Sequence, residues 1–210
     1  MPPSEVLNLR CLEELTLDNN NLTMLPGGLG RLKCLRHLSL SSNPLSFLNG
    51  EVGDLISLRQ LWVNNCQLTA LPDEIGCLEN LVRLSANSNS LRAAPDTLKN
   101  LSNLRWLNLS HNKLDKLPME LGSLTCLGYL NVNHNNLREV PQCLTELSSL
   151  ASLLMKDNLV SSVEDDVVLG LSQLTRFDLR DNHITDRPIH WKGLEYIQIG
   201  RTGLAASGVS

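Results

Sequence analysis

The sequence is poor in aromatic residues. Its 210 residues include only three tryptophans, two tyrosines and two phenylalanines, although hydrophobic residues make up 42% of the chain. A core built around large rings is therefore excluded, and the interior has to consist mainly of leucine and other aliphatic side chains. The positions of the few rings then carry information. They are Phe47, Trp62, Trp106, Tyr129, Phe177, Trp191 and Tyr196.

The sequence also lacks a surplus of positive charge and any long apolar run. Its formal net charge is -4, so no global basic field is present that would gather nucleic-acid phosphates. No apolar stretch approaches membrane-spanning length, and the first residues lack the basic and apolar regions of a signal peptide. We therefore predict no nucleic-acid partner, no membrane insertion and a cytoplasmic location.

The six cysteines lack the spacing of a metal site or a disulfide framework. They lie far apart, with no Cys-x-x-Cys pair and no clustering with histidines. In a chain of this size without a secretory signal, free thiols are the favoured interpretation. The six are Cys11, Cys34, Cys66, Cys77, Cys126 and Cys143.

What the sequence has in abundance is a unit of 23 residues. A leucine recurs at that period at Leu12, Leu35, Leu58, Leu81, Leu104, Leu127 and Leu150. Each begins a version of the pattern Leu-x-x-Leu-x-Leu-x-x-Asn-x-Leu. Most units continue with a Leu-Pro pair or a variant, and then with apolar positions three and six residues after the proline. This pattern is the signature of leucine-rich repeats.

The chemistry of one unit predicts its structure. The leucines at the fourth and sixth positions turn one face of a short strand inward, while the residues between them face out. The recurrent asparagine leaves the strand in a tight turn, where its amide satisfies backbone groups of neighbouring turns. The proline and the second apolar pair predict a helical or 3-10 turn on the opposite side.

One unit cannot bury its own apolar face, so the units must stack. We predict an α/β fold, a curved leucine-rich repeat solenoid with a parallel β-sheet on the concave face and short helical or 3-10 turns on the convex face. Residues 1–210 are predicted to form a single domain of about eight to nine repeats, with partial repeats at both ends. The partial repeats lead us to expect a piece of a longer protein.

The seventh unit departs from the pattern. It runs one residue longer than the others and carries Glu164, Asp165 and Asp166 where the proline segment is expected. The eighth unit is shorter. Irregular end repeats of this kind commonly mark the approach to a cap.

The repeat unit resembles that of one group of intracellular proteins. The segments LPDEIG at 71–76 and LPMELG at 117–122 are similar to the Ras-group leucine-rich repeats, found in the Ras suppressor protein, the SHOC family and the Scribble and Erbin scaffolds. The resemblance covers nearly the whole chain. It implies an adaptor or scaffold in signal transduction that holds a protein partner on its concave surface.

The outward positions of the predicted strands form two columns. The third position of the unit gives Glu14, His37, Gln60, Arg83, Trp106, Tyr129, Ser152, Arg176 and Tyr196. The fifth position gives Thr16, Ser39, Trp62, Ser85, Asn108, Asn131, Leu154, Asp178 and Gln198. Four of the seven aromatic residues are therefore predicted to point out of the concave sheet.

Tryptophan, tyrosine and arginine, the residue types that dominate interface energetics, fall on four successive units in these columns. A packing role on the sheet surface is the alternative interpretation. We predict a partner-binding surface there. Its residues are Trp62, Arg83, Trp106, Tyr129, Asn108, Asn131 and His111. The first unit is acidic and the middle units mildly basic, so a partner with an acidic segment near the tryptophans is a further hypothesis.

Other groups of residues are weaker candidates for a functional site. The eighth position of successive units aligns His111, His134, Asp157 and Asp181, yet a single line on an open surface is a poor metal site. The segment PGGLGRLK at 26–33 lacks the ending of a phosphate loop. No nucleophile, base and orienting acid converge on a pocket. We predict no catalysis, no cofactor and no metal.

Two predictions concern single cysteine positions. Cys66 occupies the asparagine position of the third unit, where a small thiol can replace the amide, so we predict a structural and unreactive side chain. Cys11, Cys34 and Cys126 share the position before the first leucine of the strand. Cys11 and Cys34 are thus expected one repeat apart, and buried free thiols are favoured over a disulfide.

Three functions are compatible with these patterns. The leading one is a protein-interaction module or scaffold in intracellular signalling. The second is the recognition or regulatory arm of a larger enzyme, such as a kinase, a phosphatase or a ubiquitin ligase. The third, an extracellular receptor ectodomain, requires an upstream signal peptide and disulfide-rich flanking caps.

Overall fold

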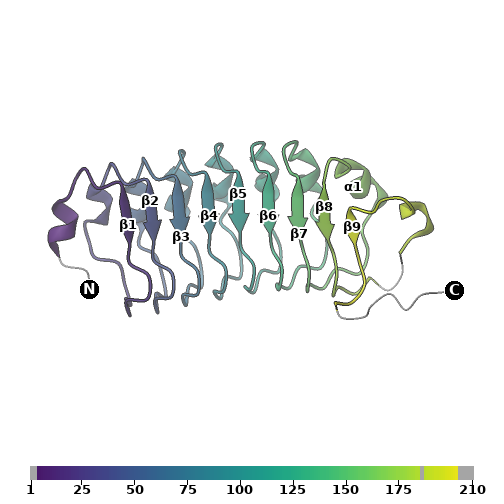
Figure 1. The fold of residues 1–210 in the computed structure, drawn as a ribbon, viewed down its shortest axis with the longest axis horizontal. Helices are drawn as coiled ribbons and strands as arrows, with labels where there is room; N and C mark the ends of the chain where they lie inside the picture. Colours follow the sequence, from purple (N-terminus) through teal and green to yellow (C-terminus); the bar gives the residue numbers. More distant parts are fainter. Residues whose placement is uncertain (1–3, 185–186, 203–210) are drawn as a thin grey trace.

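Nine short strands stack in chain order into one open parallel sheet. Each strand pairs only with the strands of the units before and after it, so the order runs from β1 to β9 without a crossover. The computed structural model describes residues 4–184 and 187–202, and the sheet runs along the length of this part of the molecule (Figure 1). The strands are β1 Glu14–Thr16, β2 His37–Ser39, β3 Gln60–Trp62, β4 Arg83–Ser85, β5 Trp106–Asn108, β6 Tyr129–Asn131, β7 Ser152–Leu154, β8 Arg176–Asp178 and β9 Ile197–Gln198.

The strands pair in register, residue for residue of the repeat. In the first outward column, Arg83 pairs with Trp106, and Trp106 with Tyr129. In the second outward column, Ser85 pairs with Asn108. The two predicted outward columns are therefore confirmed from β1 to β8. Between the columns, the central residues of β2 to β7 are all leucines with no exposed surface, and they belong to one continuous core.

Short 3-10 helices line the other side of the solenoid, as predicted. In a typical unit the proline stands just before the helix in an extended conformation, and the apolar residues three and six positions later are buried, as Ile75 and Leu78 are after Pro72. The helices are η1 Ser4–Asn8, η2 Leu29–Arg31, η3 Gly50–Asp54, η4 Asp73–Cys77, η5 Asp96–Asn100, η6 Met119–Ser123, η7 Gln142–Glu146 and η8 Ile189–Trp191. The predicted leucine-rich repeat solenoid is thereby confirmed.

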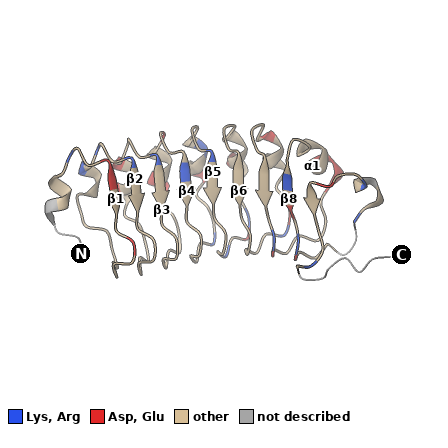
Figure 2. Ribbon diagram, viewed as in Figure 1, with Lys and Arg blue, Asp and Glu red and all other residues tan. Residues whose placement is uncertain are grey.

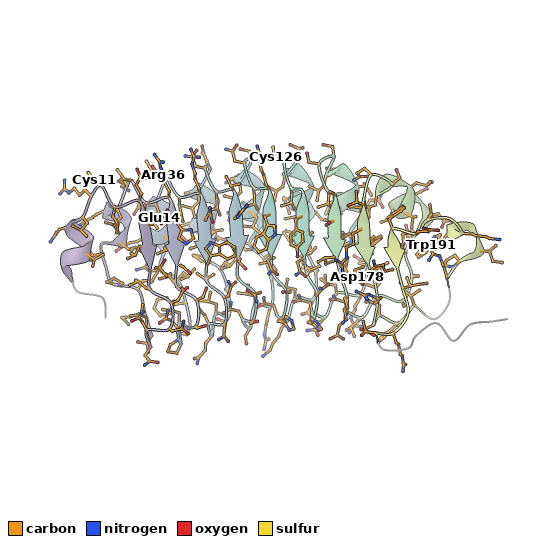
Figure 3. The ribbon with its side chains drawn as sticks, viewed as in Figure 1. Cys11, Glu14, Arg36, Cys126, Asp178 and Trp191 are labelled. Atoms are coloured by element: carbon orange, nitrogen blue, oxygen red, sulfur yellow. The ribbon has the colours of Figure 1, made fainter. Side chains whose placement is uncertain are left out.

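The irregular seventh unit forms an α-helix in place of a 3-10 turn. This helix, α1, spans Asp165–Gly170, and its first turn carries Asp165 and Asp166. Carboxylates at a helix N-terminus interact favourably with the helix dipole. Val167 and Val168 are buried, so the helix still supplies the apolar pair that covers the core. Beyond it, Trp191 is 1% exposed and packs into the core at the C-terminal end of the sheet (Figure 3).

An asparagine ladder holds the turn that follows each strand. The Nδ2 of Asn112 donates to the carbonyls of Ala86 and Leu109 at 2.9 and 3.0 Å, and its Oδ1 accepts from the Leu91 N–H at 2.9 Å. One side chain thus ties two units together and satisfies buried backbone groups of both. The same set of bonds recurs at Asn43, Asn89, Asn135, Asn158 and Asn182.

Cys66 interrupts this ladder. Its Sγ donates to the carbonyls of Leu40 and Asn64 at 3.6 and 3.4 Å, and the Leu45 N–H turns to the Asn43 carbonyl at 2.8 Å instead. Burial raises the pKa of the Cys66 thiol, which leaves less of the nucleophilic thiolate at neutral pH. The predicted structural role is confirmed, while the low reactivity stays a prediction.

The other cysteines partly contradict their prediction. All six are free, but Cys11, Cys34 and Cys126 are exposed, so the expectation that they are buried is wrong. Their shared position lies just before the chain enters each strand, and the side chains of Cys11 and Cys126 lie at the edge of the sheet (Figure 3). The predicted partial repeats include residues 1–3 and 203–210, which lie outside the described part. Within that part, no helix is long and apolar enough to cross a membrane.

Candidate functional site

Three rings form a continuous stack across the concave sheet, and we call Trp62, Trp106 and Tyr129 the aromatic ridge. Trp106 and Tyr129 face each other in register on β5 and β6, with centroids 5.4 Å apart and planes only 7° from parallel. Strand spacing of about 4.8 Å brings side chains of one column into stacking distance. The ridge thus follows directly from the repeat.

The third ring joins the ridge across an intervening strand. Trp62 stands on β3, and its centroid lies 5.4 Å from that of Trp106 on β5, at an angle of 44°. This contact is possible because β4 places the small Ser85 opposite Trp62 in the register. Ser85 is only 1% exposed, whereas Trp62 and Trp106 are half-buried.

The ring contacts show that these aromatic residues pack against one another. Such pairs contribute about 0.5–1.5 kcal/mol beyond their buried area. The Nε1 donor of Trp62 is buried without a hydrogen-bond partner among the described residues, which is unfavourable on its own. Tyr196, the fourth ring predicted to point outward, is partly buried against the core just before β9 and does not extend the ridge.

Polar groups border the ridge on β4, β5 and β6. Arg83 is exposed next to Trp106 in the register, and it forms no salt bridge within the described part of the chain. The Oδ1 atoms of Asn108 and Asn131 accept from the N–H groups of Ser110 and Asn133, at 3.0 Å each. Their Nδ2 donors have no partner in the described residues, so they remain able to donate to a bound molecule.

His111, the last predicted binding residue, belongs to a different group. It adopts a left-handed conformation with φ of 53° in the turn after β5, and its ring stacks on His134 with centroids 4.1 Å apart. Nδ1 of His134 lies 2.5 Å from Oδ2 of Asp157. Burial and the neighbouring His134 lower the pKa of His111. The structure therefore does not bring His111 into ring contact with the aromatic ridge.

The predicted line of turn residues is confirmed in part. His111, His134 and Asp157 contact one another in sequence, whereas Asp181 interacts with Lys156 at 3.5 Å and with Thr202. Within residues 4–184 and 187–202, no group of three or more histidine, cysteine or acidic side chains is arranged to hold a metal ion.

The sequence reasoning missed a buried carboxylate on β8. The Asp178 side chain is 2% exposed and accepts hydrogen bonds from Arg180 Nη2 at 2.6 Å and Arg176 Nη2 at 3.2 Å. Burial alone raises the pKa of Asp178, but the hydrogen bonds and charge of Arg180, helped by Arg176, outweigh it and lower the pKa overall. The signal was present as Arg-x-Asp-x-Arg, because alternate residues share one face of a strand.

Charge is unevenly distributed along the concave sheet. Figure 2 shows β1 with an acidic residue and β4 with a basic one, namely Glu14 and Arg83. Asp18, beyond β1, lines an open cleft of about 380 Å³ together with Trp62 and several polar side chains. The aromatic ridge therefore begins where the acidic end of the sheet gives way to the basic middle.

Comparisons with known proteins agree with the fold. A model of a leucine-rich repeat region matches residues 94–187, and a second leucine-rich repeat model matches residues 10–68. A comparison with curated proteins finds no match. Among solved structures, a leucine-rich repeat protein of Leptospira interrogans is 31% identical with a TM-score of 0.83, over 93% of this chain and 55% of that one.

Two proteins of Listeria monocytogenes share the fold at lower identity. The internalin InlF is 24% identical with a TM-score of 0.69, over 94% of this chain and 63% of that one. The functional domain of InlJ, which includes a cysteine ladder, is 22% identical with a TM-score of 0.76, over 93% of this chain and 40% of that one. The chain thus spans less than two thirds of each of these three proteins.

The fold is a solenoid with an open parallel sheet on one side and short helical turns on the other. The repeat pattern, this architecture and the two family matches together make the chain a leucine-rich repeat protein. No match singles out the Ras-group type, which stays a prediction.

Proposed function

We propose that this chain is a protein-interaction module that binds a protein partner on its concave sheet, with the aromatic ridge at the centre of the contact. The observation that carries the proposal is the ring stack over β3 to β6, bordered by the exposed Arg83 and by the Nδ2 donors of Asn108 and Asn131. Aromatic and arginine side chains dominate the energetics of protein interfaces, and they cluster near the centre.

The stacking supports a binding role as well as a packing role. Side chains that are already fixed by neighbours lose little conformational freedom when a partner covers them, so the free energy of association is more favourable. A sheet of parallel strands on a solenoid also offers the extended concave surface through which repeat proteins bind.

The surroundings of the sheet favour binding over catalysis. The cleft beside Trp62 on the concave face is open, and the polar groups beside the ridge are amides and a guanidinium, which recognise a partner through hydrogen bonds and charge. A non-enzymatic scaffold role in cytoplasmic signalling is part of the proposal. It rests on the similarity of the repeat unit to the Ras-group proteins.

The test is a double substitution in the ridge. Trp62→Ala/Trp106→Ala is expected to keep the fold, measured by circular dichroism, and to lose partners that the natural chain recovers in quantitative proximity labelling. Phe47→Ala/Met119→Ala is the matched control, because both side chains are exposed and lie outside the strands. If the ridge variant folds and still recovers every partner at the natural level, the concave sheet is not the binding surface.

A further inference from the structure

Three arginines on successive units carry charge that the chain itself does not neutralise. Arg59, Arg83 and Arg105 form no salt bridge among the described residues. Arg36 occupies the same repeat position as Arg59, one unit earlier, and it is paired with Glu13 at 3.4 Å. At this repeat position, the arginine of the second unit is thus paired with an acidic side chain, whereas the arginines of the third and fifth units are not.

Two of these arginines, Arg59 and Arg105, border a cleft at the edge where β3, β4 and β5 begin. The cleft has a volume of about 350 Å³. It exists because Val82, a short apolar residue, stands in the column between Arg59 and Arg105, where a third long side chain would fill the space. The residues that line it are Arg59, Asn80, Val82, Asn103 and Arg105, and none of them is acidic.

The walls of the cleft are fixed by hydrogen bonds. The Nδ2 groups of Asn80 and Asn103 donate to the carbonyls of Ile56 and Glu79, at 2.9 Å each. Only the backbone of Glu79 takes part, and its carboxylate is not part of the cleft lining. The cleft is therefore lined by two arginines and by no acidic side chain.

Guanidinium groups bind carboxylates through two parallel hydrogen bonds, and such charge-assisted bonds are stronger than neutral ones. Two arginines on either side of Val82 stand two strands apart, about 10 Å along the sheet, a spacing that admits acidic side chains between them. A long polyanion along the sheet is disfavoured, because Glu13, Glu14 and Asp18 lie on the first unit, at one end of the sheet. A short acidic segment of a protein fits this charge pattern.

We propose that this basic cleft, formed by Arg59, Val82 and Arg105 with Arg83 beside it, binds aspartate or glutamate side chains of a partner protein. The inference rests on the proposed function and specifies its partner, because Arg105 directly precedes Trp106 of the aromatic ridge. The partner segment places apolar side chains on the ridge and acidic side chains in the cleft.

The test selects partners by chemistry. A display library of random peptides is enriched on the immobilised natural chain and, in parallel, on Arg59→Glu/Arg105→Glu. The natural chain is expected to select peptides in which acidic residues adjoin an apolar or aromatic residue. The best of these peptides is expected to bind the charge-reversal variant at least about tenfold more weakly, and to bind the natural chain less tightly as salt is added.

A matched control separates the cleft from general charge. Arg92→Glu/Arg138→Glu changes two exposed arginines that are also two units apart but do not line the cleft, and it is expected to retain binding of the selected peptide. Arg59→Gln/Arg105→Gln removes the charges without reversing them, and a smaller loss is expected. Circular dichroism confirms that each variant is folded before binding is measured.

Three results would overturn the inference. Acidic peptides that bind both glutamate variants equally would show a non-specific charge effect. Selected peptides without acidic residues that depend on Trp62 and Trp106 would reject the cleft but retain the proposed function. Failure of the natural chain to enrich any peptide over Arg59→Glu/Arg105→Glu also rejects the cleft, and the ridge substitutions in proximity labelling then decide the proposed function separately.

Discussion

The inward and outward positions of the same strands differ sharply. The central residue of β2 to β7 is a leucine without exposed surface in every unit, whereas its neighbours on the other face range from serine to tryptophan. The inward column must be uniform because each leucine packs against the leucines of the units before and after it. The outward columns are free of that constraint, and they are where the chain carries its individual chemistry.

The largest effect is expected from a test that compares an inward residue with the outward residue next to it. Leu61→Ala on β3 removes a side chain with no exposed surface, and we expect the free energy of unfolding to fall by about 2–5 kcal/mol. Gln60→Ala, its outward neighbour, is expected to change it by less than about 0.5 kcal/mol. Urea unfolding of both variants provides the measurement. Equal costs would show that the two faces are not distinct.

The next prediction concerns the asparagine ladder. Asn112→Ala removes the acceptor of the Leu91 N–H and the donor to the carbonyls of Ala86 and Leu109. Buried groups left unpaired cost about 1–3 kcal/mol each before water or rearrangement compensates, so we expect a loss of about 2–3 kcal/mol. Asn136→Ala, at an exposed position, serves as the control. A loss below about 0.5 kcal/mol for Asn112→Ala would contradict the ladder.

Asp178 is a charged outward residue that is nevertheless buried, and it forms ion pairs with two arginines. Its pKa is lowered in the folded chain, so its contribution is present above the ordinary aspartate pKa of about 3.9 and is lost as the pH falls through the lowered value. Asp178→Asn is expected to cost about 1–3 kcal/mol at neutral pH and progressively less in acid. Unfolding curves across this pH range measure the difference. A cost that does not change with pH would exclude the ion pairs as its origin.

The smallest effect is expected for a substitution that repairs the asparagine ladder at Cys66. Cys66→Asn restores an acceptor for the Leu45 N–H and a stronger donor to the Leu40 carbonyl, and we expect a gain of about 1 kcal/mol. Cys77→Asn, at an exposed position in η4, is expected to have little effect. Thermal unfolding of the two variants distinguishes them. A less stable Cys66→Asn would mean that the third turn has adapted to the thiol.

The architecture was predictable because the spacing of 23 residues equals one turn of the solenoid. Once Leu35, Leu58 and Leu81 are aligned, the strands, their register and both outward columns follow, and the structure confirms them. The roles of the recurrent asparagine and of Cys66 followed from hydrogen-bonding capacity alone. These features depend on one repeat position at a time.

Features that depend on two columns at once were not predictable in the same way. Trp62 reaches Trp106 only because Ser85 is small, and Asp178 is buried only because arginines stand two residues before and two residues after it. The exposure of Cys11 depends on the local direction of the backbone at the start of the strand, which the repeat pattern does not specify. The basic cleft likewise requires a valine between two arginines.

The most direct test of the account is oxidation of side chains by hydroxyl radicals, with and without a partner recovered by the natural chain. Trp62, Trp106 and Tyr129 are expected to be protected in the complex, while the exposed Phe47 and Met119, outside the strands, are oxidised as in the free chain. Unchanged oxidation of the aromatic ridge, together with protection of Phe47 or Met119, would contradict binding on the concave sheet.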